Sequence, residues 1–70
     1  VLKVEDKNFK LAIEDLNKSI SLNPKESRYY FNRGLLKMEL GQKQTGCEDI
    51  EKASKLGDKK ALEIQKQYCK

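Results

Sequence analysis

The sequence predicts an all-α fold in which antiparallel helical hairpins stack on one another and a capping helix closes the C-terminal end. Three observations predict it: apolar residues recur at three- and four-residue spacing, no segment alternates as a strand does, and the chain repeats itself. A chain of 70 residues has room for one domain. Residues 1–70 are therefore expected to form a single domain.

The internal repeat has a period of 34 residues and relates residues 1–24 to residues 35–58. Seven pairs are identical without a gap, and other pairs keep their character. A period in the range of roughly 20–50 residues is typical of stacked repeat architectures. The identical pairs are Leu2 and Leu36, Lys3 and Lys37, Glu5 and Glu39, Glu14 and Glu48, Asp15 and Asp49, Lys18 and Lys52, and Leu22 and Leu56.

A first helix is expected over residues 8–22. Its apolar residues, among them Phe9 and Leu16, fall on one helical face. Pro24 ends this helix because proline lacks the backbone donor and disfavours helical geometry in the residue before it. Residues 1–6 resemble the last turns of a preceding helix, whose apolar side chains would cover part of the same face.

A second helix is expected over residues 27–40 and a third over residues 43–56. Gly41 and Gly57 follow them, and glycine readily adopts the left-handed conformation that ends a helix. The two helices are joined by a short turn, so they should form an antiparallel hairpin.

The start of the third helix has an alternative. Thr45 and Glu48 have the spacing of a capping box, which would start the helix two residues later. A fourth helix begins after Asp58, a favourable N-cap residue, and continues to near Tyr68.

Several residues at fixed positions of the 34-residue unit form a known pattern. They are Tyr30, Arg33, Gly34, Leu40 and Gly41 in a first helix and its turn, and Ala12, Leu16, Ser19, Leu22 and Pro24 in a second helix. This pattern resembles the tetratricopeptide repeat, a pair of antiparallel helices. The resemblance implies a partial repeat over residues 1–24, a complete repeat over residues 25–58 and a capping helix over residues 59–70. It also implies the C-terminal end of a longer array. The segment from Leu56 to Asp58, with Ala61, resembles the related Sel1-like repeats as an alternative.

Some positions depart from the family pattern. Gly46 stands where alanine is usual, which permits close helix contact. Lys37 and Lys43 stand where aromatic residues are usual, so thinner packing is expected in the second unit. Asp58 replaces the usual proline.

The sequence contains no histidine, which removes the ordinary general base and any Ser–His or Cys–His pair. The adjacent carboxylates Glu14-Asp15 and Glu48-Asp49 are expected on solvated helix faces beside lysines. No glycine-rich phosphate loop is present. We therefore expect no enzymatic activity, no cofactor and no metal.

The net charge is +4, and residues 51–70 hold six lysines against three acidic residues. Because acids and lysines alternate, this segment is expected to be a solvated helical face, and nucleic acid is not an expected partner. No apolar run is long enough to cross a membrane, and no targeting segment is visible. A soluble chain is expected, either cytoplasmic or extracytoplasmic.

The family resemblance implies a protein–protein interaction module in which first helices line a concave groove for a partner segment. Phe31, Leu35 and Met38 are spaced by four and three residues, so they share a stripe. Tyr30 and Gly34 should pack against adjoining helices instead. The implied groove residues are Arg28, Phe31, Asn32, Leu35, Met38 and Glu39.

Two alternatives remain open at this point. The chain could be a structural repeat end that binds no free ligand, or a homodimer formed through the uncovered face of helix 8–22. A carboxylate clamp for a chaperone C-terminus is a narrower idea, for which Asn32 and Lys66 are the candidate residues. Leu62 stands where that clamp would need another basic residue.

Cys47 and Cys69 are too few for a disulfide scaffold and too far apart in sequence for a metal-binding pair. We expect them on the antiparallel third and fourth helices, as small buried contacts. Packed helix axes lie about 8–10 Å apart, whereas a disulfide needs Cα atoms within about 7 Å. A bridge in an oxidising compartment is the alternative.

Overall fold

The structure is a computed structural model that describes residues 6–69. In this part of the chain there are four α-helices and no strand: α1 (Asp6–Leu22), α2 (Ser27–Glu39), α3 (Lys43–Lys55) and α4 (Lys59–Tyr68). The predicted all-α class is confirmed. The expectation of a preceding helix over residues 1–6 falls, apart from Asp6, outside the described residues.

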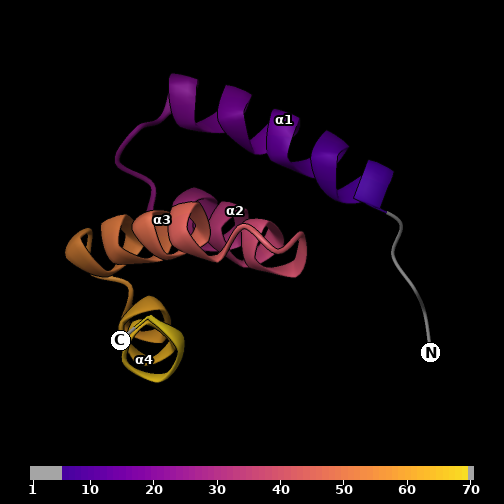
Figure 1. Cartoon of the computed structure of the whole chain (residues 1–70). Helices are drawn as coiled ribbons and strands as arrows, with labels where there is room; N and C mark the ends of the chain where they lie inside the picture. Colours follow the sequence, from indigo (N-terminus) through magenta and orange to yellow (C-terminus); the bar gives the residue numbers. More distant parts are fainter. Residues whose placement is uncertain (1–5, 70) are drawn as a thin grey trace.

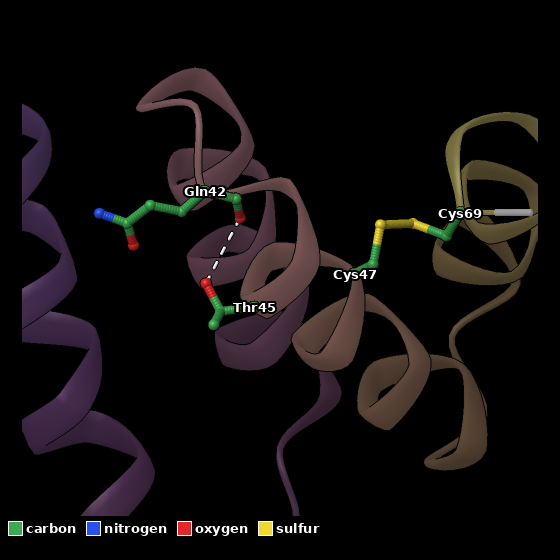
Figure 2. The surroundings of a disulfide bond; sticks show 4 residues. All are labelled: Gln42, Thr45, Cys47 and Cys69. Carbon is green, nitrogen blue, oxygen red and sulfur yellow. Dashed lines mark hydrogen bonds between the residues drawn. A yellow bond between two sulfur atoms is a disulfide. The ribbon is translucent and has the colours of Figure 1, made fainter.

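The helices begin and end close to where the sequence places them. α1 begins two residues before the expected start. α3 begins at Lys43, so the later start suggested by the capping-box spacing is wrong. Thr45 lies inside the first turn, where its hydroxyl donates to the backbone oxygen of Gln42 at 3.4 Å (Figure 2). Glycines with positive φ follow α2 and α3, as expected: Gly41 at 83° and Gly57 at 105°.

The helices form three tiers (Figure 1). α2 and α3 run antiparallel in the middle tier, α1 lies on one side of them and α4 on the other. α4 is seen nearly end-on while α3 lies across the view, so α4 is steeply inclined to α3 rather than antiparallel to it. This inclination contradicts the antiparallel arrangement expected for the last two helices.

The buried core lies between the middle tier and α4. Tyr30 of α2 packs with Ile50 and Ala53 of α3 and with Ala61 of α4, and the last three are completely buried. The hydroxyl of Tyr30 donates to the backbone oxygen of Pro24 at 2.8 Å, which ties the α1–α2 turn to the core. Tyr30 and Gly34 pack against adjoining helices, as expected: Tyr30 belongs to this core, and a Cβ added at Gly34 would meet Gly46 and Ile50 of α3.

Within the described part of the chain, none of the helices has the length and apolar character needed to cross a membrane.

Candidate partner-binding groove

The six predicted groove residues all belong to α2, and the structure divides them by exposure. The apolar members Phe31, Leu35 and Met38 are partly buried and pack against the core. The polar members are exposed. The apolar stripe therefore has one side in the core and the other at the surface, with polar side chains beside it. The exposed polar members are Arg28, Asn32 and Glu39.

Two hollows flank this stripe. The α1–α2 hollow has a volume of about 450 Å³ and the α2–α4 hollow a volume of about 410 Å³. Leu35 lines both, so the two hollows meet at this residue. The α1–α2 hollow is lined by Ala12, Asp15, Leu16, Asn32, Leu35 and Leu36. The α2–α4 hollow is lined by Leu35, Met38, Glu39, Ile64 and Tyr68.

Arg28 and Phe31 line neither of these two hollows. The side chain of Arg28 is 76% exposed, and its Nε donates to a carboxylate oxygen of Glu26 at 2.7 Å. This hydrogen bond, with the charge of Glu26, raises the pKa of the Arg28 guanidinium. The structure thus brings four of the six predicted residues together at the hollows and leaves two outside.

Two residues of the α2–α4 hollow were missed at the level of sequence. Ile64 and Tyr68 come from α4, the helix expected only to cap the array. They lie four residues apart and therefore on one helix face, which was the available signal. The Tyr68 side chain is a large apolar group left 52% exposed.

A charged network lies behind the groove and connects three helices. Arg33 donates two hydrogen bonds to the carboxylate of Asp49, at 2.8 and 2.7 Å, and a third to Asn17 of α1 at 2.8 Å. The ammonium of Lys37 lies 3.1 Å from the same carboxylate. The hydrogen bonds to Asp49 raise the pKa of the Arg33 guanidinium, which therefore stays charged.

The expectation of solvated adjacent carboxylates is wrong for Asp49, which is only 7% exposed. Asp49 precedes the completely buried Ile50 on α3, so its side chain faces α2. The available signal was on α2: Arg33 and Lys37 lie four residues apart on one face. Lys37, at a position where an aromatic residue is usual, helps to neutralise Asp49.

The two cysteines form a disulfide between α3 and the end of α4 (Figure 2). The expectation of unbonded buried cysteines is therefore wrong. Their Cα atoms are 5.7 Å apart, within bonding range. The expectation compared helix axes, but facing Cα atoms lie closer together than the axes do. Cys69 is also the C-cap residue, with φ −119° and ψ 47°, so it has already left the helix.

No metal site emerges among residues 6–69, where no group of three or more cysteine, aspartate or glutamate side chains is placed to hold an ion. Both cysteines there are committed to the disulfide. The polar groups that line the two hollows are the amide of Asn32 and the carboxylates of Asp15 and Glu39; the other lining side chains are apolar except for the ring hydroxyl of Tyr68.

Comparison with known proteins agrees with the helical arrangement. The sequence model of the tetratricopeptide repeat family matches this chain twice, over residues 2–26 and residues 27–57. The chain is 38% identical over 56 residues to sperm-associated antigen 1 of Rattus norvegicus, an alignment that covers 80% of this chain and 6% of that protein. No solved structure matches significantly. Tetratricopeptide repeats are generally protein–protein interaction modules. The two matched repeats and the all-helical fold show that the chain belongs to the tetratricopeptide repeat family.

Proposed function

We propose that this chain binds an extended segment of a partner protein across the exposed side of α2. The observation that supports this best is that the α1–α2 and α2–α4 hollows meet at Leu35. Together they make an apolar surface that crosses the helix and carries polar side chains beside it. Alternate side chains of an extended segment point the same way about 7 Å apart, so two of them could enter the two hollows.

The side chains at this surface suit such a segment. Leu35 and Met38 offer apolar contact, and Asn32 offers an amide that can both donate to and accept from a peptide backbone. Phe31 lies one turn and Arg28 two turns before Leu35 on the same helix, so both would extend the contact toward the start of α2. Arg28 would then exchange Glu26 for an acceptor on the partner.

Selection of binders from a random peptide display library, against the chain with its disulfide intact, tests this function. Amide shifts in NMR spectra of the selected complexes should be largest at Asn32, Leu35 and Met38. The variant Asn32→Trp, which fills the α1–α2 hollow, should weaken binding at least about tenfold. The matched control is Lys55→Trp, at a side chain that is 72% exposed on α3. Shifts confined to the polar face of α3, or equal loss in both variants, would contradict the proposal.

A second candidate function is a homodimer formed through α1. Leu11 and Leu22 are large apolar side chains of α1 that are 52% and 88% exposed. They are eleven residues apart, which is close to three helical turns, so they lie on one side of α1. This side is roughly opposite the face of Phe9 and Leu16, through which a homodimer was expected from the sequence. Sedimentation at micromolar concentration should then show a dimer that Leu11→Glu dissociates. A monomer at all concentrations would contradict the homodimer, and peptide binding would remain as the proposed function.

We propose the division of the chain into repeats over residues 1–24 and 25–58 and a cap over residues 59–70. Support comes from the burial of Ala61 in the core, which places α4 against the preceding hairpin. Deletion of residues 59–70 should expose this core and lower the unfolding midpoint in urea. A midpoint within error of the parent would contradict a capping role.

We also propose that the chain works in an oxidising compartment. Structural disulfides persist in such compartments and are rare where glutathione and thioredoxin keep thiols reduced, and this chain carries the Cys47–Cys69 bridge. Alkylation of acid-quenched cells, followed by mass spectrometry of the chain, would count its thiols. Two alkylated cysteines in the native chain would contradict this assignment.

A further inference from the structure

The α2–α4 hollow combines four apolar side chains with one charged group. Leu35 and Met38 of α2 and Ile64 and Tyr68 of α4 form its walls, and Glu39 contributes a carboxylate. Glu39 is exposed and makes no ion pair among the residues that the structure describes. The hollow is therefore an apolar cleft with a carboxylate at its edge that has no ion-pair partner among the described residues.

The backbone adds to the negative potential there. Met38 and Glu39 belong to the last turn of α2, and Tyr68 is the last residue of α4. The peptide dipoles of a helix leave partial negative charge at its C-terminal end, where cations are favoured. The C-terminal ends of α2 and α4 and the Glu39 carboxylate thus all make the electrostatic potential at the hollow more negative.

The lysines nearest in sequence do not line this hollow. Lys66 is two residues from both Ile64 and Tyr68, which places it about 200° around α4, on the opposite side. Lys60 lies one turn before Ile64, toward the start of α4. Lys43 lines a neighbouring hollow with Gln44, Cys47 and Cys69, which meets the α2–α4 hollow at Tyr68. Lys37, two residues before Glu39, is paired with Asp49.

We propose that the α2–α4 hollow binds a lysine or arginine side chain of the partner segment; this rests on the proposed function of the groove. The aliphatic stem of such a side chain lies along Leu35, Met38 and Ile64. Its cation reaches the Glu39 carboxylate and the exposed ring of Tyr68.

Glu39 then sets the specificity of the hollow. An uncharged side chain of the same length would make the apolar contacts but would desolvate the carboxylate without giving it a partner. An acidic side chain would be repelled by the negative charge of Glu39. Discrimination therefore comes from the ammonium or guanidinium group rather than from the stem.

The test uses four probes: the N-acetyl amides of lysine, arginine, norleucine and glutamate. Norleucine is the matched probe because it keeps an unbranched apolar stem without the charge. Titrations are followed by the methyl signals of Met38, Leu35 and Ile64 in the intact, disulfide-bonded chain. Lysine and arginine should bind about fivefold more tightly than norleucine at low salt, a preference that should shrink as salt is raised. Glutamate should bind more weakly than norleucine.

The variant Glu39→Gln should bring the lysine-to-norleucine preference to within about twofold. Glu14→Gln is the matched control, since Glu14 is exposed on α1 and lines neither hollow of the groove. Norleucine binding as tightly as lysine, an unchanged preference in Glu39→Gln, or no shift at Ile64 with any probe would overturn the proposal. If display-selected peptides still bind at α2 in any of those cases, the groove function stands and only the basic preference is lost. If those peptides bind elsewhere, the groove function itself fails.

Discussion

The backbones of Gly34 and Gly46 meet where α2 crosses α3. A Cβ atom placed on Gly46 would lie 2.7 Å from the carbonyl oxygen of Gly34 and 2.7 Å from Cγ of Met38. A Cβ atom on Gly34 would likewise lie 2.7 Å from the carbonyl oxygen of Gly46. The two clashes with carbonyl oxygens cannot be relieved by a side-chain rotation, because these oxygens belong to the backbone. The two glycines thus allow the close approach of the helices that bear the groove and the core.

Gly46→Ala should destabilise the chain although alanine is the usual residue at this position of the repeat. The better helix propensity of alanine is worth about 1 kcal/mol, but overpacking at the crossing should cost about 2–3 kcal/mol. A net fall in the free energy of unfolding is expected in urea titrations followed by circular dichroism. Glu48→Ala, at an exposed position of the same helix, should stay within about 0.5 kcal/mol of the parent. A Gly46→Ala variant as stable as the parent would show that α2 and α3 can separate at little cost.

Asp49→Asn should lower the free energy of unfolding by about 3 kcal/mol, because it leaves the cations of Arg33 and Lys37 beside an uncharged amide in a largely buried site. The internal repeat supplies the control: Asp15 occupies the same position in the first unit but is exposed. Asp15→Asn should therefore change stability by less than about 0.5 kcal/mol. Equal effects of the two substitutions in urea titrations would mean that the buried network adds nothing to stability.

Reduction of the Cys47–Cys69 disulfide should lower stability by about 3 kcal/mol, as expected for closing a loop of this length in the unfolded chain; the cysteines are 22 residues apart. The measurement is thermal or urea unfolding with and without dithiothreitol. The double variant Cys47→Ser, Cys69→Ser should unfold like the reduced parent and should not respond to dithiothreitol. A parent chain with the same midpoint under both conditions would refute a stabilising role for the bridge.

Asp58→Ala should lower stability by about 1 kcal/mol, because the Asp58 carboxylate accepts a hydrogen bond from the backbone N–H of Ala61 at 3.1 Å and so caps α4. Hydrogen exchange at the Ala61 amide should accelerate in the variant. Asp58→Ser, which keeps a capping oxygen, should retain most of the protection. Unchanged exchange in Asp58→Ala would mean that tertiary packing alone holds the first turn of α4.

Much of the fold could be predicted because its determinants are local. Three- and four-residue spacing located the helices, and Gly41 and Gly57 marked the ends of two of them. The stripe of Phe31, Leu35 and Met38 could be assigned to one helix face for the same reason. The contribution of Ile64 and Tyr68 could not, since a hollow between α2 and α4 depends on how steeply α4 lies against the hairpin.

The sequence by itself determined that this is a helical repeat protein and which residues share each helix face. Only the tertiary structure decided that Asp49 is buried against Arg33, that Cys69 bonds Cys47, and that α4 supplies a wall of the groove. Helical periodicity is a property of neighbouring residues and can be read along the chain. The distance and inclination between helices depend on side-chain packing at their crossings, as at Gly34 and Gly46, which brings together residues far apart in sequence.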